Sequence, residues 1–374
     1  MDNNIVIKQP NFQIVNFNAA YVAPKYVFSK GKSMITWGKN NNFPAYLHDL
    51  FNSKGASLHT SIINKKVSYI AGKGFDKIGD INLQDFIERN DLTAEIKKAS
   101  YDFEILNGFA LEVIWSMDKT KISSVKHFPI SQLRFGLIDD EHHLPYFWYC
   151  KDWTNERKYG MEAINAYNED FPGGKQIYWY CEYNPENTLV DYPIPFYSNS
   201  INAIETSHQI AQFHLNQAKQ GYAPSFLINF ATGIPSPEER DLWYEAFQQQ
   251  YAGTENGGKA IVTYSENELQ KPTFVKIDLN DSDERFLMLK DWIAEEIVIG
   301  HDIPPQLLIL TAGKLSGTSE GPEKVNEFKE GYIQTRQIVF ENILNKILKP
   351  NGYTDKIVLK KEIIKIETTT TNGN

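Results

Sequence analysis

Residues 281 to 348 constrain the fold of this 374-residue chain most, because local signals there assign a helix, a stop, a loop and a second helix. Asp281-Ser282-Asp283-Glu284 carries the short polar and acidic side chains that stabilise a helix start. Gly300 and Pro304-Pro305 predict where this helix ends. Between these signals, apolar residues recur every three or four positions and predict one buried face: Phe286, Leu289, Ile293 and Ile297.

The segment after the prolines predicts an exposed loop, because two glycines and four hydroxyl residues cannot build a core. Its residues are Leu310, Thr311, Ala312, Gly313, Lys314, Leu315, Ser316, Gly317, Thr318 and Ser319. Gly321-Pro322 then predicts the start of a long helix, with proline at the first helical position. That helix would reach about Leu348 and span roughly 40 Å, with Gly331 as the expected bend. Its expected buried stripe is Val325, Phe328, Tyr332, Val339, Ile343 and Ile347.

The rest of the chain predicts an α+β fold with more than one packed region, because 374 residues exceed the size of a single growing core. Helices are expected over 45–71, 93–106 and, after Tyr192-Pro193-Ile194-Pro195, from 201 to Gly221. Strands are expected over most of 109–183, within 222–277 and over 357–366, before a polar tail. The aromatic strands 146–150 and 177–181 are interpreted as sheet core or subunit interface, with ligand stacking as the alternative.

Four segments resemble the portal proteins of tailed bacteriophages, of the short, HK97-like kind. Ile303-Pro304-Pro305-Gln306-Leu307-Leu308 is similar to the turn that ends their stem helix, and Gly257-Gly258-Lys259-Ala260-Ile261-Val262 to a strand at the end of their clip segment. Residues 192–222 resemble the segment that forms the first stem helix. Trp37-Gly38-Lys39-Asn40-Asn41-Asn42-Phe43-Pro44 resembles an N-terminal signature of portals from phages of Bacteroidetes. The order of these parts along most of the chain carries the resemblance.

The resemblance implies a portal architecture with an α+β wing, a two-helix stem, a small α/β clip, a tunnel loop and a long kinked helix. It divides the chain into an N-terminal wing (1–200), stem helix 1 (201–221), clip (222–277), stem helix 2 (278–301), tunnel loop and kinked helix (302–350), and a short strand with a polar tail (351–374). Family members often carry a helical crown at the carboxyl end, and here little room is left for one.

The function that the resemblance implies is a dodecameric ring at one capsid vertex, through which the genome is packaged and ejected. The implied partners are other copies of the chain, double-stranded DNA in transit without sequence specificity, the terminase large subunit, the major capsid and scaffolding proteins, and a head-tail adaptor. The chain itself would not be an enzyme, would need no cofactor or metal, and would end in the virion after assembly in the host cytoplasm. The second stem helix would help to line the channel with Glu284, Lys290, Glu295 and Glu296.

In this scheme the tunnel loop projects into the channel, where Lys314 meets phosphate weakly, and Gly331 lets the long helix carry loop movements outward. The alternative for Lys314 is a solvated loop lysine. The net charge of −9 argues against a protein that grips DNA by neutralising phosphates, and it suits a conduit along which DNA slides. An ordinary acidic cytoplasmic protein would explain the same charge.

Several other features predict no specialised chemistry. Cys150 and Cys181 are too few for a disulfide framework, and no signal peptide or membrane span is predicted. Gly313-Lys314-Leu315-Ser316 lacks the spacing of a phosphate loop, and His142-His143 beside three acidic residues is expected to be an exposed turn rather than a metal site. His301 is expected to cap helix carbonyls.

Two competing hypotheses stay open at this point. One is another virion or adaptor protein without a DNA channel. The other is an enzyme that acts on a polysaccharide or a peptide, which would need a pocket with two carboxylates roughly 5 to 10 Å apart.

Overall fold

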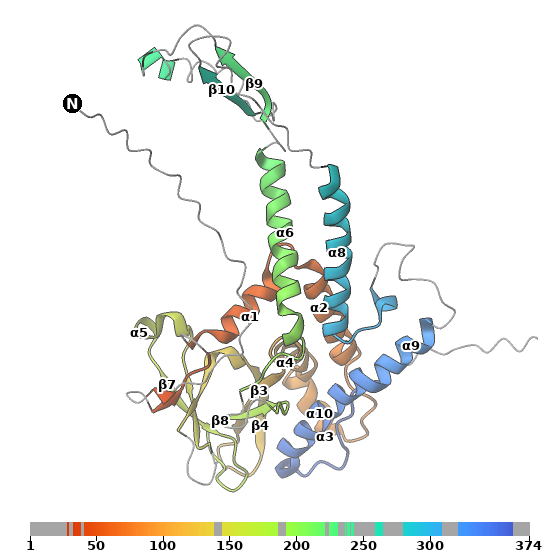
Figure 1. Cartoon of the computed structure of the whole chain (residues 1–374). Helices are drawn as coiled ribbons and strands as arrows, with labels where there is room; N and C mark the ends of the chain where they lie inside the picture. The colour runs from red at the N-terminus through yellow and green to blue at the C-terminus, as the bar shows by residue number, and fades with distance from the viewer. Residues whose placement is uncertain are drawn as a thin grey trace, which may run out of the picture.

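The computed structural model describes residues 28–29, 33–38, 41–137, 144–185, 192–220, 224–230, 236, 238–239, 241–242, 259–264, 280–308 and 321–361. A body of one sheet and several helices carries two long helices, α6 (Ile201–Gln220) and α8 (Asn280–Gly300), which project from it side by side (Figure 1). At the far end of these helices lie β9 (Pro224–Phe230) and β10 (Lys259–Tyr264), which pair in parallel (Figure 1). We call α6 and α8 together the stem. The predicted helices and strands in these segments are confirmed.

The body is built on an eight-stranded sheet of order β1-β2-β5-β6-β7-β8-β3-β4. All neighbouring strands are antiparallel except the parallel pair β7 and β8. The strands are β1 (Phe28–Ser29), β2 (Met34–Ile35), β3 (Gly108–Trp115), β4 (Ile122–Phe128), β5 (Leu133–Gly136), β6 (Tyr146–Tyr149), β7 (Glu162–Ala166) and β8 (Lys175–Cys181). The mixed α and β content expected from the sequence is confirmed.

The two aromatic strands contribute to the core of the sheet, as expected. Phe147 on β6 lies against Trp179 on β8, with ring centroids 5.4 Å apart, and Phe135 lies 4.9 Å from the same indole. Tyr192 stacks on Phe135 at 4.5 Å and donates its hydroxyl proton to the carbonyl oxygen of Ile35. Stacked and edge-to-face contacts of this kind add stability beyond area burial alone.

The N-terminal helices depart from expectation at one point. Instead of one helix over 45–71, α1 (Phe43–Asn52) and α2 (Ser57–Ala71) are separate. The break falls at Gly55, whose φ of +114° only glycine adopts without strain, so the expectation of a continuous helix was wrong. An unpredicted helix, α3 (Ile81–Arg89), follows, and Asp80 caps it by accepting from the amides of Asn82 and Leu83. The next helix, α4 (Leu92–Leu106), confirms the prediction for 93–106.

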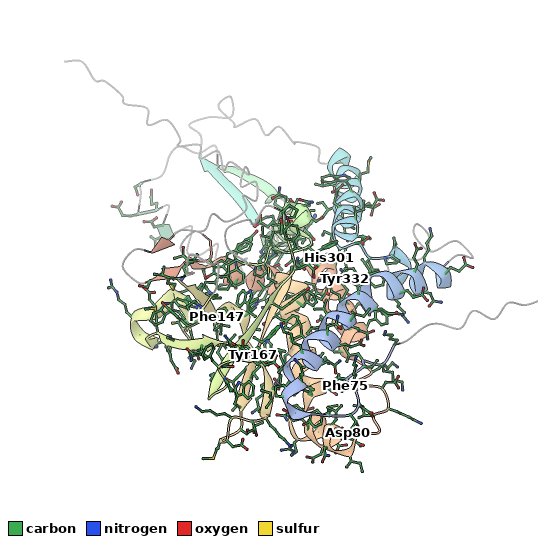
Figure 2. All side chains as sticks on the ribbon, turned by 90° about the horizontal axis from the view of Figure 1, so that it is seen from below. Phe75, Asp80, Phe147, Tyr167, His301 and Tyr332 are labelled. Atoms are coloured by element: carbon green, nitrogen blue, oxygen red, sulfur yellow. The ribbon has the colours of Figure 1, made fainter. Side chains whose placement is uncertain are left out.

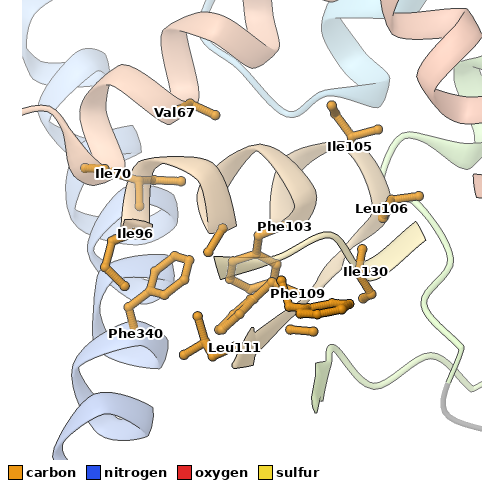
Figure 3. Packing of buried hydrophobic residues seen from close by; sticks show 14 of the residues in the cluster. Val67, Ile70, Ile96, Phe103, Ile105, Leu106, Phe109, Leu111, Ile130 and Phe340 are labelled. Carbon is orange, nitrogen blue, oxygen red and sulfur yellow. The ribbon is translucent and has the colours of Figure 1, made fainter. Parts of the chain in front are cut away.

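Helix α4 lies at the centre of the core, between the sheet and α2, with the C-terminal helix beside it (Figure 3). Phe103 on α4 contacts Phe109 on β3 and Phe340 on the C-terminal helix, with ring centroids 5.4 and 5.7 Å apart (Figure 3). Phe109 and Phe340 stack on each other at 4.5 Å. This triad joins the sheet to a segment more than two hundred residues further along the chain.

The long C-terminal helix has three parts: α9 (Gly321–Phe328), a π-helical turn (Lys329–Ile333) and α10 (Gln334–Ile347). Its start at Gly321 and its end near Leu348 are confirmed. Short helical segments complete the body: Ile130–Gln132, Trp153–Asn155, α5 (Glu156–Tyr159), Ser198–Ser200, Pro305–Leu307 and Lys349–Asn351. A strand was expected over 357–366. Within the described residues 357–361 this expectation is wrong, because Leu359 forms only an isolated bridge with Phe75.

The buried face expected for α8 is confirmed near the body only: Ile293 and Ile297 are buried, Leu289 is exposed, and the side chain of Phe286 lies outside the description. On α6, Ile201 and Ile204 are buried near the body, whereas Leu215 is exposed. No helix in the described part of the chain is long and apolar enough to cross a membrane.

Candidate functional site at the base of the stem

The base of the stem is where α8 ends against the body. Ser200, just before α6, donates its hydroxyl proton to the carbonyl oxygen of Glu296 on α8 at 2.9 Å. Gly300 allows this contact, because a Cβ atom there would overlap the Ser200 hydroxyl. Directly after Gly300, the chain turns at Asp302, whose φ is +48°, and enters Ile303-Pro304-Pro305.

A buried lysine connects the end of α8 to the body. Lys66 on α2 is 1 % exposed and donates to the carbonyl oxygen of His301 at 2.6 Å. The Lys66 ammonium also lies 3.7 Å from a carboxylate oxygen of Glu104 on α4 and 3.9 Å from the centroid of the Tyr332 ring. Burial lowers the pKa of Lys66 to about 8, although the nearby Glu104 carboxylate opposes this shift.

The same carboxylate holds the π-helical turn. Tyr332, within this turn, donates its hydroxyl proton to Glu104 at 2.8 Å, and Arg336 on α10 lies 3.8 Å from the other carboxylate oxygen. Arg336 also donates to the side-chain oxygen of Asn107 at 3.1 Å and lies over the Phe103 ring. Burial raises the pKa of Tyr332 well above its ordinary value, and the Glu104 carboxylate adds to this. Figure 2 shows His301 and Tyr332 close together below the stem.

His301 does not cap helix carbonyls, so the expectation for this residue was wrong. Its imidazole is buried, with Nε2 2.9 Å from Nδ1 of His59 on α2, and it stacks on Tyr197 at 4.8 Å. Nε2 of His59 is buried without a hydrogen-bond partner. Burial lowers the pKa of His59 to about 4 and lowers that of His301 as well, so both rings are neutral near pH 7.

A groove of about 720 Å³ opens beside this buried cluster, between the end of α8 and the start of the long helix. Val298, Ile303 and Phe328 contribute apolar surface, and Gly331 and Tyr332 reach it from the π-helical turn. Its charged residues are of both signs: Asp302, Lys324 and Glu327.

The predicted tunnel loop, 310–319, lies outside the described residues, so its role stays a prediction. Its flanks are described: Leu308 follows the end of α8, and Gly321 begins α9. Gly331 lies in the π-helical turn, and a Cβ atom there would meet nothing within 4 Å. A π-helical turn is a recognised cause of helix bending, although the kink itself stays a prediction.

The four predicted channel residues on α8 do not share one face. Lys290 and Glu295 are exposed, Glu296 is half-buried, and the side chain of Glu284 lies outside the description. At roughly 100° per residue, Lys290 and Glu295 point about 140° apart around the helix axis. Only part of this set can face a single channel.

The sequence analysis missed Lys66, Glu104 and Arg336 as members of one cluster. A partial signal existed for Lys66, because it lies between the buried apolar residues Ile63, Val67 and Ile70 on α2. A charged side chain on the apolar face of a helix predicts a buried partner, but not which one.

The Trp37 to Pro44 segment plays a structural part. Asn41 accepts from Nε of the buried Arg134 through its side chain and from Nη2 through its carbonyl oxygen, the latter at 2.9 Å. Trp37 stacks on Tyr192 at 4.6 Å. Burial lowers the pKa of Arg134 to about 10, and the guanidinium stays charged at pH 7.

Metal and disulfide chemistry find no support in the described part of the chain. No group of three or more His, Cys, Asp and Glu side chains could hold a metal ion there. His142-His143 lies outside the described residues. Neither Cys150 nor Cys181 forms a disulfide bond.

Comparison with known proteins gives structural neighbours only. No protein-family model matches the sequence, and no curated protein matches it. A chain from the virion of a native gene transfer agent particle superposes with a TM-score of 0.57 at 11% identity, over 91% of this chain and 86% of that one.

Two chains from particle necks are similar as well. A chain from the neck of the native particle, computed with C12 symmetry, gives a TM-score of 0.56 at 13% identity, over 92% of this chain and 88% of that one. A chain from the neck of the empty particle, computed with C6 symmetry, gives 0.54 at 12% identity, over 85% and 84%. The chain therefore has the fold of protein chains that build the virion and neck of gene transfer agent particles.

Proposed function

We propose that this protein is a portal protein, which forms a ring at one capsid vertex and conducts the genome during packaging and ejection. The observation that carries the proposal is the fold shared, over 92% of the chain, with a neck component computed with C12 symmetry. The order of parts along the chain supports it too: a small module of parallel strands comes between the two stem helices, and a third long helix follows the stem.

The base of the stem is suited to holding the stem firmly on the body while DNA passes, as this function requires. The buried Lys66, Glu104, Tyr332 and Arg336 tie the end of α8 and the π-helical turn to the same helix, α4. Breaking such a buried network costs several kcal/mol, because an uncompensated charge would remain. Residues 309–320 join the end of the stem to the long helix that carries Tyr332 and Arg336, and we propose that they form the tunnel loop beside the channel.

In this function the ring would be a conduit rather than a motor. Terminase would supply the hydrolysis of ATP, and a head-tail adaptor would replace it after packaging. The capsid and scaffolding proteins would surround the wing, which we assign to residues 1–200 together with the long helix, and the clip would comprise 222–277. The excess of acidic residues suits DNA that slides without being held.

A neck component without a DNA channel is the second candidate, because two of the neighbouring chains come from particle necks. Subunit number and channel width distinguish the two candidates. Mass photometry of the purified full-length chain should give a particle of twelve subunits of 42.9 kDa, or a closed ring close to that number. A monomer at every concentration, also in the presence of scaffolding protein, would refute the proposal.

A further inference from the structure

Helix α8 exposes a row of large apolar side chains on the side that faces away from its packed residues. Met288, Trp292 and Ile299 are 72%, 55% and 71% exposed. Their spacings of four and seven residues place them on one face of the helix. Ile293 and Ile297, which pack against the body, lie roughly 120° or more away around the axis. We call Met288, Trp292 and Ile299 the apolar row.

The apolar row continues into the groove at the base of the stem. Ile299 belongs to both, since it also lines the groove together with Val298, Ile303 and Phe328. The combined surface therefore runs from the middle of α8 to the start of the long helix. Several large apolar side chains exposed on one face are typical of an interaction site, and Trp and Met are enriched in such sites.

The chemistry of this surface argues against DNA as its occupant. The charged residues at the groove, Asp302, Lys324 and Glu327, include both signs and sum to a negative value. Glu295 lies between Trp292 and Ile299 on the same face of α8 and is exposed. A nucleic-acid surface would instead carry clustered Lys and Arg. An apolar row would also be poorly hydrated if it faced a water-filled channel.

We propose that the apolar row and the groove receive a second copy of this chain, as the contact between neighbouring subunits of the ring. This inference rests on the proposed function, and the neighbouring structures with C12 and C6 symmetry support a second copy as the occupant. In a closed ring each copy offers one face to the next copy and accepts a different face from the previous one, so two different faces of each subunit are covered, and the apolar row would be one of them. The face of α8 with Glu295 then meets the neighbour.

Methionine oxidation tests this assignment in the intact protein, because the chain contains a matched reference. Met117, in the turn between β3 and β4, is fully exposed and lies outside the apolar row. Purified particles are treated with hydrogen peroxide, and oxidation of each methionine is followed by peptide mass spectrometry against the urea-unfolded chain.

In the assembled particle Met288 should oxidise roughly tenfold more slowly than in the unfolded chain, whereas Met117 should stay within about twofold. Rings in which Met288 oxidises as fast as in the unfolded chain would overturn the inference and leave the proposed function standing. Failure of the wild-type chain to form any ring would overturn both.

Substitutions provide the second arm. Trp292→Asp with Ile299→Asp should convert rings into monomers in mass photometry, because two carboxylates would be placed in a dehydrated contact. Phe171→Asp is the control, since Phe171 is 76% exposed on the loop before β8 and lies outside the apolar row. Rings of unchanged size and dissociation behaviour in the double variant would overturn the assignment. Circular dichroism shows whether the monomers are folded. If they are not, the oxidation of Met288 alone tests whether the apolar row is the contact between subunits.

Discussion

Acidification should destabilise this protein through the histidine pair below the stem. His59 and His301 share one hydrogen bond in a fully buried site, and the second nitrogen of His59 has no partner. A proton added to either ring would be enclosed in a poorly polarisable environment, and at His301 it would also lie near the Lys66 ammonium. The folded state therefore resists protonation, and the unfolded state does not.

The size of the effect follows from the pKa of His59, which is lowered from 6.5 to about 4. Well above pH 6.5 the ring is neutral in both states and contributes no pH dependence. As the pH falls from 6.5 towards 4, only the unfolded chain takes up the proton, so the free energy of unfolding decreases. For His59 alone the loss is about 2 kcal/mol between pH 7.5 and pH 5, and the lowered pKa of His301 adds to it.

Urea unfolding followed by tryptophan fluorescence at pH 7.5, 6 and 5 measures this loss. His59→Gln keeps a hydrogen-bonding group next to His301 but removes the titration, so its free energy of unfolding should fall by about 2 kcal/mol less than that of the wild type over the same interval. His214→Gln, at an exposed position on α6, is the matched control and should behave like the wild type. An equal pH dependence in His59→Gln and the wild type would refute the reasoning.

Three further perturbations test other parts of the structure. Gly300→Ala should destabilise the fold by about 1–3 kcal/mol in urea unfolding, because its Cβ would overlap the Ser200 hydroxyl; an unchanged midpoint would contradict the tight contact at the stem base. Gly331→Ala should fit without a clash and raise the local stability of the π-helical turn by up to about 1 kcal/mol, which would slow amide hydrogen exchange there. Normal DNA packaging by this variant would mean that the predicted kink is not functional. Deleting residues 313–317 should leave ring assembly intact and impair retention of packaged DNA, whereas loss of assembly would make this loop part of a subunit interface.

The elements that could be predicted from the sequence were those with strong local signals. The start of α9 at Gly321-Pro322 and the end of α8 at Gly300 follow from caps and breakers, which act within a few residues. The break at Gly55 was missed, although Ser53 and Gly55 carried the turn signal, because apolar residues on both sides continued the helical pattern. Helix α3 buries only Leu83 and Phe86, too few for a clear period.

The buried cluster at the stem base could not be predicted, because its members meet only through the tertiary fold. Lys66 and His301 are 235 positions apart, and Glu104 and Tyr332 are 228 apart. Periodicity placed Tyr332 on the buried stripe but gave no reason for a carboxylate opposite its hydroxyl. The apolar row on α8 could not be predicted either. Helical periodicity predicts an apolar face but does not distinguish a face packed within the chain from one that contacts a neighbouring subunit.

Cryo-electron microscopy of the purified full-length chain, viewed along the symmetry axis, tests the portal proposal most directly. We predict a closed ring with α8 beside a central channel at least about 20 Å wide, enough for duplex DNA given the dimensions of its grooves. A ring whose centre is closed or narrower than the duplex, or particles without rotational symmetry, would contradict the proposal that this protein conducts a genome.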